Sequence, residues 1–337
     1  MKKKIRKPMH WALLILTHVA VLGIMLVIYV LPHHVFSYEA VDTGITSSRE
    51  VFDVEPQITP VPVVKTDAET DTAALPTVEP TDAPGSFKIK YADKFSDGSK
   101  SVSNGTYTGP YCSVTVTKGT EFSSNYTIAD IYVSDVSCIV SGFAKDAYGR
   151  NYEWITDIAE RNLAIACING DFYCAGNYGV VIRNGKLYRA ARSGSDICVL
   201  YWDGTMKVVP HEKFNAEKQM KLGAYQAWSF GPSLLTSEGE AIQSFEGQNL
   251  RRANPRTAIG YFEPGHYCFV VVDGRQKNSR GMTLEQLSAL MAQIGCKVAY
   301  NLDGGESSSM VVCNKLYTSP ANGGRAIADT IMVLDEP

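Results

Sequence analysis

An uncharged apolar segment near the N-terminus constrains this chain more than any other feature. Residues 11–31 contain no formally charged side chain. At about 1.5 Å rise per residue, a helix of that length crosses a hydrocarbon core of about 30 Å. We therefore predict one transmembrane helix over residues 11–31, after a basic tail over residues 1–10. The alternative is a cleaved signal peptide, whose apolar region is usually about 7 to 15 residues long; Val35-Phe36-Ser37 is a weak cleavage site for it.

The charges on either side of this segment predict its orientation. Residues 1–37 carry five basic and no acidic side chains, and residues 38–86 carry ten acidic and two basic ones. Because basic flanks stay on the cytoplasmic side, we expect a single-pass protein of the cell membrane with a cytoplasmic N-terminus and an extracellular domain. This architecture favours a bacterial surface. Residues 87–337 carry 25 charges of each sign. This balance lacks the excess of basic residues that indicates nucleic-acid binding.

Residues 32–86 have the composition of a spacer. They include six prolines between Pro56 and Pro84, with many Thr, Asp and Glu and few aromatic residues. Such a segment buries too little apolar surface to offset its ordering entropy, and its like charges keep it extended. We predict a disordered stalk over residues 32–86 and one folded domain over residues 87–337. The sequence gives no indication of the oligomeric state.

The folded part is predicted to be a mixed, strand-rich α+β domain with few helices. Short apolar or alternating segments are separated by Asn-Gly, Asp-Gly and Glu-Gly turns at residues 184–185, 203–204 and 238–239. A helix is expected over residues 153–161, with Trp154, Ile155, Ile158 and Ala159 on one face. A stronger helix is expected over residues 283–294, where Thr283 and Gln286 form a capping box and Gly295 ends it.

The second helix lies between two apolar strands, Tyr267 to Val272 and Lys297 to Leu302. This spacing predicts one βαβ crossover with a right-handed connection, its strands parallel and either adjacent or separated by one strand. Asp273 and Asp303 directly follow these strands, and Asn169-Gly170-Asp171 follows a third strand expected at residues 163–168. Although Asp-Gly and Asn-Gly also form ordinary turns, three such endings predict one cleft beyond the carboxyl ends of the strands.

Carboxylates in such a cleft have two uses. They can act as acid, base or nucleophile at a glycosidic centre, or hold a hard cation such as calcium. Arg256 and Arg275 lie close to these motifs, and a guanidinium can grip a phosphate with two hydrogen bonds. Acid and arginine together suggest a phosphorylated sugar, although either arginine could instead form a structural ion pair.

Five segments together resemble a known family. They are NGDFY (169–173), SFGPSLL (229–235), NPRTAIGY (254–261), VVDGRQ with SRGMTLEQL (271–287) and NLDGGESSSMVV (301–312). In this order they resemble the phosphodiester glycosidase domain, which occurs in N-acetylglucosamine-1-phosphodiester α-N-acetylglucosaminidase, the mannose-6-phosphate uncovering enzyme, and in bacterial envelope proteins associated with exopolysaccharide. The resemblance covers residues from about 126 to 334. It implies hydrolysis of the bond between an anomeric carbon and a phosphodiester oxygen, in metabolism of an envelope glycopolymer.

The resemblance also implies roles for individual residues. Asp303 is the leading catalytic carboxylate, with Asp171 and Asp273 as second carboxylates. The predicted substrate-binding residues are Asn169, Gly170, Arg256, Arg275, Asn301, Gly304, Gly305, Glu306 and Ser307. Glu306 departs from the family pattern, where a small residue follows the two glycines, and this leaves the identity of the sugar open. No cofactor and no metal are expected, although calcium could bind the carboxylate cluster.

Two other functions remain compatible with the residues. A metal-dependent phosphodiesterase would use the carboxylates to hold a cation, and a glycan-binding module would use the cleft without catalysis. The predicted folded domain, residues 87–337, contains two histidines, His211 and His266, and neither lies in a motif. A Ser-His-Asp triad or a histidine-rich zinc site is therefore not expected. The eight cysteines form no Cys-x-x-Cys pair, and we expect at most one or two disulfides.

Overall fold

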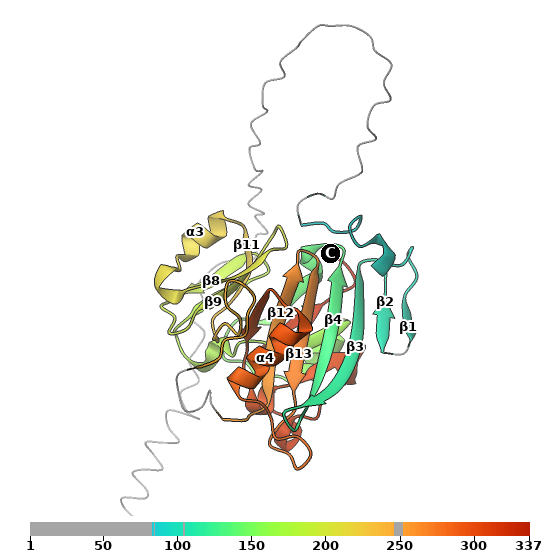
Figure 1. Cartoon of the computed structure of the whole chain (residues 1–337). Helices are drawn as coiled ribbons and strands as arrows, with labels where there is room; N and C mark the ends of the chain where they lie inside the picture. Colours follow the sequence, from blue (N-terminus) through green and yellow to red (C-terminus); the bar gives the residue numbers. More distant parts are fainter. Residues whose placement is uncertain (1–82, 84, 104, 246–251) are drawn as a thin grey trace, which may run out of the picture. The chain divides into compact units, whose positions relative to one another are not determined.

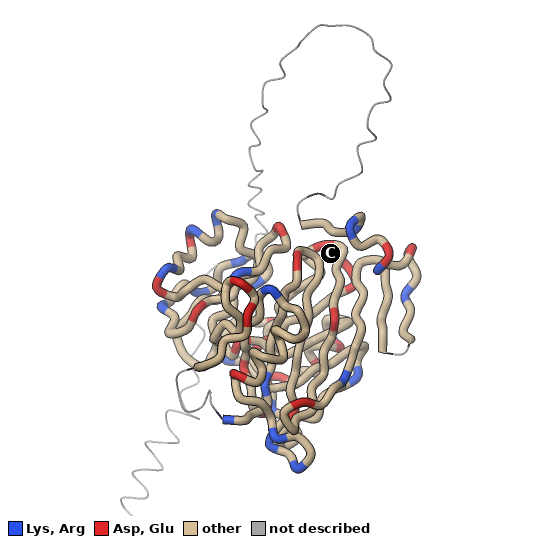
Figure 2. Tube along the Cα trace, viewed as in Figure 1, with Lys and Arg blue, Asp and Glu red and all other residues tan. Residues whose placement is uncertain are grey.

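The computed structural model describes residue 83 and residues 85–103, 105–245 and 252–337. The predicted tail, transmembrane segment and nearly all of the predicted stalk lie outside these residues. Among the described residues, no helix is long and apolar enough to cross a membrane. Acidic and basic residues are interspersed along the described trace (Figure 2), in line with the balanced charge of residues 87–337.

The largest sheet contains the two ten-residue strands of the domain (Figure 1). Its seven strands are ordered β1-β2-β3-β4-β13-β12-β14, and every neighbouring pair is antiparallel. Their bounds are β1 Ser101–Ser103, β2 Thr106–Thr108, β3 Cys112–Glu121, β4 Ser124–Val133, β12 Arg256–Glu263, β13 His266–Val272 and β14 Val298–Asn301.

The predicted crossover is present in this sheet. β13 and β14 are both antiparallel to β12, which lies between them, so they run parallel with one strand separating them. The predicted mixed, strand-rich domain contains no parallel ladder among its described strands, because β12 lies between β13 and β14 and all pairings between described strands are antiparallel. The α+β class itself is confirmed by a strand-rich domain with few helices.

The crossover helix α4 (Leu284–Ile294) covers one side of the large sheet. Thr283 and Gln286 form the predicted capping box, and Gly295 ends the helix in the left-handed conformation. One face of α4 is buried in a cluster with strand residues such as Val270 and Ala258. The helix therefore forms where its sequence pattern predicts, because cap, apolar face and stop signal agree.

Two five-stranded antiparallel sheets complete the domain. One has the order β16-β15-β6-β17-β5, and the other has the order β10-β9-β11-β7-β8. The bounds are β5 Ile139–Phe143, β6 Ala166–Asn169, β15 Met310–Val312, β16 Lys315–Leu316, β17 Asp329–Val333, β7 Val180–Arg183, β8 Lys186–Ala190, β9 Ile197–Tyr201, β10 Met206–Val209 and β11 Ala224–Trp228. Side chains from all three sheets, including Ile131, Ile168 and Leu200, share the largest core.

The remaining helices are short, and two details differ from the predictions. Helix α2 (Ile155–Arg161) buries Ile155, Ile158 and Ala159 as expected, but Trp154 precedes the helix in an extended conformation and is exposed. The strand expected from Leu163 begins only at Ala166, since Leu163 has a positive φ and closes the turn after α2. Helix α3 spans Ala216–Lys221. All eight cysteines carry free thiols in the structure.

The cap of α4 gives a stability prediction. Thr283→Ala removes the hydroxyl that accepts from the backbone N–H of Gln286 at 3.2 Å, so we expect the free energy of unfolding to fall by about 1 kcal/mol. Urea denaturation measures it. Thr283→Ser keeps the hydroxyl and serves as the control, and equal stability of the Ala and Ser variants would contradict the role of the cap.

Candidate active site

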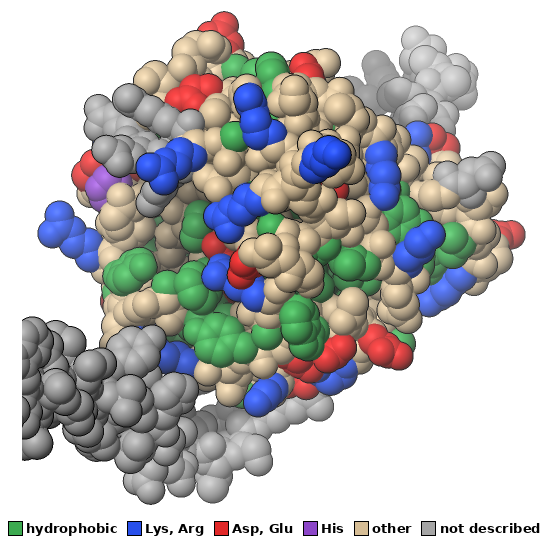
Figure 3. All heavy atoms as spheres, turned by 90° about the horizontal axis from the view of Figure 1, so that it is seen from below, with side chains coloured by type: hydrophobic (Ala, Val, Ile, Leu, Met, Phe, Trp, Pro, Cys, Tyr) green, Lys and Arg blue, Asp and Glu red, His purple; other side chains and the backbone are tan. Residues whose placement is uncertain are grey.

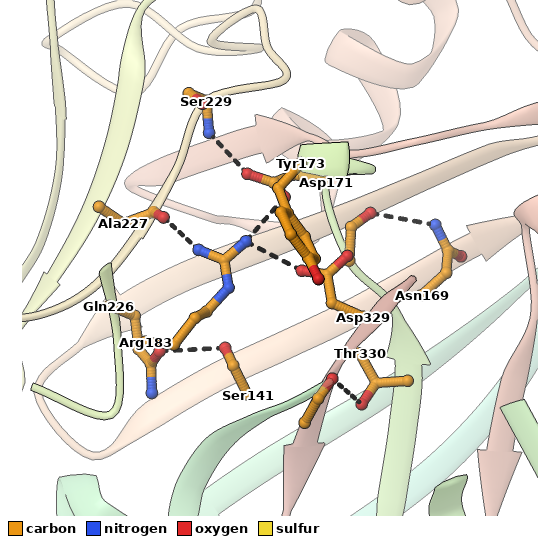
Figure 4. Close-up of polar contacts among 12 residues, drawn as sticks. Ser141, Asn169, Asp171, Tyr173, Arg183, Gln226, Ala227, Ser229, Asp329 and Thr330 are labelled. Carbon is orange, nitrogen blue, oxygen red and sulfur yellow. Dashed lines mark hydrogen bonds and ion pairs between the residues drawn. The ribbon is translucent and has the colours of Figure 1, made fainter. Parts of the chain in front are cut away.

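A buried arginine joins the two smaller sheets through two carboxylates (Figure 4). Nη2 of Arg183, the last residue of β7, lies 2.7 Å from Oδ1 of Asp171 and 2.9 Å from Oδ2 of Asp329. The three side chains are almost completely excluded from solvent. Asp171 also accepts from the backbone N–H of Ser229 at 2.9 Å, while Nη1 of Arg183 donates to the carbonyl of Ala227. This triad therefore ties β6, β7, β11 and β17 together.

The triad carries two carboxylates for one guanidinium in a dry environment. Burial and the neighbouring Asp171 carboxylate raise the pKa of Asp329, whereas Arg183 lowers it, and the net direction is upward. Asp329 therefore keeps its proton to a higher pH than an ordinary aspartate does. A fully buried pair of carboxylates with one cation can reach neutrality in this way.

Asp329 also forms part of the wall of a pocket with a volume of about 240 Å³. Seen from below in Figure 3, acidic and basic side chains meet a group of hydrophobic ones on the surface of the molecule. Polar, aromatic and small residues line the pocket. They are Tyr152, Asn169, Gly170, Phe172, Asp303, Ser307, Arg325, Ala326, Ile327, Ala328 and Asp329.

Asp303 and Arg325 form an ion pair in this pocket. Nη2 of Arg325 lies 2.6 Å from Oδ2 of Asp303, and Nε of Arg325 donates to Oγ of Ser307 at 2.6 Å. The Arg325 side chain is 41% exposed and that of Asp303 is 12% exposed. Burial raises the pKa of Asp303, and Ser307 and Arg325 partly offset this increase. The guanidinium of Arg325 also lies 5.1 Å from the ring centroid of Phe172.

Glycines let the backbone bring these groups together. A Cβ at position 170 would lie 2.3 Å from Oδ2 of Asp329, and one at position 304 would lie 2.8 Å from the carbonyl oxygen of Pro255. Gly305 has a φ of +68° and donates from its backbone N–H to the same Pro255 carbonyl at 3.0 Å. The Asp-Gly-Gly sequence after β14 therefore folds tightly against the start of β12 and positions Asp303.

Asn169 connects the segments that meet at the pocket. Its Nδ2 donates to the carbonyl of Asp303 at 2.7 Å, and its Oδ1 accepts from Oγ1 of Thr257 at 2.8 Å and from the backbone N–H of Ser309. Asn301 has a supporting position instead, since its Nδ2 donates to the carbonyl of Gly231 at 2.7 Å. Asn301 is not among the residues that line the pocket.

Other predicted site residues make contacts away from the pocket lining. Oδ1 of Asp273 accepts from the backbone N–H of Ser319 at 2.9 Å. Neither Asp273 nor Asp171 lines the 240 Å³ pocket with Asp303, so the three predicted carboxylates do not share this pocket. Glu306 accepts from Nδ2 of Asn322 at 2.7 Å.

The two predicted arginines also point to backbone and amide partners. Arg256 donates from Nε to the carbonyl of Met282 at 3.0 Å, and burial lowers its pKa to about 10. Arg275 donates to Oδ1 of Asn254 at 3.1 Å and lies beside Gly305. Neither arginine lines the 240 Å³ pocket. Substrate contact by these residues stays a prediction.

Sequence reasoning missed Arg183, Arg325, Asp329 and the pocket position of Phe172. Arg183 ends the otherwise apolar strand sequence VVIR, and a charge at a buried strand end needs a partner. That was an available signal. Arg325 and Asp329 lie after the last recognised motif, and no sequence pattern indicated that they belong to the site. The carboxylate of Asp329 reaches the site only through the pairing of β17 with β6.

Calcium binding by the carboxylates stays an alternative to the metal-free site expected from the sequence. The guanidinium of Arg183 bridges Asp171 and Asp329, and Asp303 is paired with Arg325. In the part of the chain that the structure describes, the group whose ligand atoms could surround one ion is Asp196, His211 and Glu212. None of these three residues lines the 240 Å³ pocket.

Comparisons with known proteins place this geometry in context. A family model described as phosphodiester glycosidase matches residues 162–334. The SPbeta prophage-derived uncharacterized protein YomE of Bacillus subtilis (strain 168) is 31% identical over 191 residues, which cover 54% of this chain but only 30% of that protein.

Two solved structures have a similar fold. The zebrafish N-acetylglucosamine-1-phosphodiester alpha-N-acetylglucosaminidase catalytic domain, auto-inhibited by its pro-peptide, matches with a TM-score of 0.54 and 21% identity, over 70% of this chain and 85% of that one. A hypothetical protein from Synechocystis matches with a TM-score of 0.53 and 11% identity, over 66% and 62% of the two chains. At these identities the similarity concerns the fold.

The raised pKa of Asp329 predicts how stability depends on pH. A carboxyl group that holds its proton more tightly in the folded state contributes stability that is present below its unfolded pKa and lost as the pH rises through its folded pKa. We expect the stability of the wild type relative to Asp329→Asn to decrease as the pH increases from about 4 to about 8. Urea denaturation of both proteins across this range measures the difference. A difference that stays constant or grows with pH would contradict the assignment.

Proposed function

This chain belongs to the phosphodiester glycosidase family, and we propose from that membership that it hydrolyses the bond between the anomeric carbon of a sugar and a phosphodiester oxygen. Water supplies a hydroxyl group to the anomeric carbon and a proton to the solvent or base, and the phosphate leaves as a phosphomonoester. The observation that carries the proposal is the contact between the carboxylate of Asp303 and the guanidinium of Arg325 on the wall of one pocket.

The reaction needs opposite charges at adjacent atoms of the substrate. Positive charge develops at the anomeric carbon in an oxocarbenium-like transition state, and a carboxylate stabilises it or attacks it. Negative charge develops on the departing phosphate, which a guanidinium binds. Oδ2 of Asp303 lies 2.6 Å from Nη2 of Arg325. One substrate can therefore place its sugar at the carboxylate and its phosphate at the guanidinium.

Neighbouring groups support the separate roles of Asp303 and Arg325. Ser307 binds Nε of Arg325 and holds the guanidinium at the pocket. The backbone N–H of Gly304 donates to Oδ1 of Asp303 at 2.9 Å, which favours the ionised carboxylate. A phosphate is a good leaving group, so this chemistry depends on positioning and charge more than on a strong general acid.

The biological substrate we propose is a sugar-1-phosphodiester in a cell-envelope polymer, such as a wall or capsular polysaccharide. The sequence of residues 1–86 supports this location, since a basic tail, an apolar segment and an acidic spacer would place the domain outside a bacterial cell membrane. The glycosidase reaction on a small sugar-1-phosphodiester is the part that can be tested directly.

The position of the cleaved bond tests the reaction. The full-length chain in detergent is incubated in oxygen-18 water with a panel of sugar-1-phosphodiesters and nucleotide sugars, with and without chelator. We expect oxygen-18 in the released sugar and the same rate with chelator. Oxygen-18 in the phosphate would identify a phosphodiesterase, and saturable binding without product would identify a glycan-binding module.

Asp303→Asn tests the leading carboxylate in the same assay. We expect turnover to be abolished, while thermal stability stays close to that of the wild type because the amide oxygen can still accept from Gly304. Thermal unfolding followed by circular dichroism checks the fold. Wild-type rates in this variant would show that Asp303 is not catalytic.

Arg325 should also control the protonation of Asp303. Because Arg325 lowers the raised pKa of Asp303, Arg325→Gln should move the acidic limb of the kcat/KM profile to higher pH and reduce kcat/KM at its optimum by about a hundredfold. Arg325→Lys keeps the positive charge and should leave the limb near its wild-type position. If the acidic limb of the kcat/KM profile does not move in Arg325→Gln, Arg325 does not control the protonation of Asp303.

A further inference from the structure

A second, larger cavity adjoins the catalytic pocket. Its volume is about 600 Å³, and Phe172 lines both cavities. Four aromatic residues line it, Phe172, Tyr173, Tyr178 and Phe230, together with polar residues such as Arg189 and Ser195. The catalytic pocket, at about 240 Å³, is smaller than the roughly 300–1,000 Å³ typical of ligand sites, so it encloses only part of a larger substrate.

We propose that this second cavity binds an uncharged sugar ring of an extended substrate whose sugar-1-phosphate group occupies the catalytic pocket. The proposal rests on the proposed phosphodiester glycosidase function. It adds that the enzyme acts on an oligosaccharide or polymer and prefers it to a short phosphodiester.

Tyr178 provides a preformed stacking surface in the cavity. Its side chain is exposed, with a relative accessibility of 60% for the residue, yet it rests against Gly176. A Cβ at position 176 would lie 2.3 Å from Cε1 of Tyr178. The glycine therefore lets the ring lie directly on the backbone while most of the residue remains accessible. An aromatic ring held in this way binds the apolar face of a sugar at a low entropic cost.

The charged side chains that line the cavity, Arg189 and Asp171, already bind other groups of the protein. The guanidinium of Arg189 donates to the carbonyls of Tyr173, Gly176 and Gly179 at 2.7, 2.9 and 3.2 Å. Asp171, which also lines the cavity, is buried in its ion pair with Arg183. Arg189 thus supports the loop that carries Tyr178. A cavity with aromatic walls and engaged charges suits a neutral sugar better than a second phosphate.

Phe172 gives the two cavities a common wall. It has a left-handed backbone conformation with a φ of +53°, and the Arg325 guanidinium of the catalytic pocket lies 5.1 Å from its ring centroid. A ligand that contacts Phe172 in the second cavity is therefore next to the phosphate-binding group of the first. This continuity favours one extended ligand across both cavities.

Kinetics with two substrates test the proposal. The short substrate is the methyl phosphodiester of a sugar 1-phosphate that the wild type hydrolyses, and the long substrate carries neutral sugar units beyond the same reacting group. We expect Tyr178→Ala to lower the ratio of kcat/KM for the long over the short substrate by about five- to tenfold. Tyr178→Phe keeps the ring and is the matched control.

Gly176→Ala provides an independent variant. Gly176 has an extended φ of −164°, so alanine fits the backbone, but its Cβ displaces the Tyr178 ring. We expect the same direction of change as in Tyr178→Ala. An unchanged long-to-short ratio in both variants would overturn the proposal, as would a Tyr178-dependent preference for a nucleotide sugar over the oligosaccharide.

Binding to the Asp303→Asn variant separates this proposal from the catalytic one. Saturation-transfer NMR with neutral tetrasaccharides of glucose and of N-acetylglucosamine measures contact without turnover. Binding that is weakened at least fivefold by Tyr178→Ala supports the sugar site even if no phosphodiester is hydrolysed, in which case the proposed reaction alone fails. Absence of Tyr178-dependent binding to either tetrasaccharide would overturn the sugar site, whatever the result of the hydrolysis assay.

Discussion

The site depends on the buried guanidinium of Arg183. Removal of three ionisable side chains from water is unfavourable unless each charge is paired and hydrogen-bonded. Here Arg183 contacts two carboxylates and two backbone carbonyls, and Asp171 receives a further N–H from Ser229. Loss of Arg183 would leave an uncompensated buried charge, which typically costs about 3–5 kcal/mol. The geometry of the loops after β6 and β11 is therefore tied to this ion triad.

The triad is also connected to the pocket, because Asp329 belongs to both. Its carboxylate contacts Arg183 on one side and forms part of the pocket wall beside Asp303 on the other. Burial raises the pKa of both aspartates, but their partners differ. Asp303 meets a half-exposed arginine that can also meet a ligand, whereas the partner of Asp329 is buried. In the proposed reaction Asp303 is therefore the carboxylate that meets the substrate, whereas Asp329 holds the pocket wall in place.

Segments from different sheets approach each other closely at glycines. Gly170 permits contact with the Asp329 carboxylate, and Gly304 permits contact with the start of β12. Asn169 then links the Asp303 loop to β12 by hydrogen bonds. The same principle recurs at Gly176, where the missing side chain allows Tyr178 to rest on the backbone. In each case the missing side chain allows a close contact that a Cβ would block.

The sequence by itself determined the local structure, because caps, stop signals and apolar periodicity act over a few residues. It predicted α4 with its capping box at Thr283, the parallel pair around that helix, and the strand endings that carry Asn169 and Asp303. Its family motifs also identified the family. It could not show that β12 separates β13 from β14, or that Asp273 binds the Ser319 backbone. Only the tertiary structure decided which charges meet. The pairing of Arg183 with Asp171 and Asp329, and of Arg325 with Asp303, joins residues 12 to 146 positions apart, and such contacts arise from the packing of separate sheets around a common core.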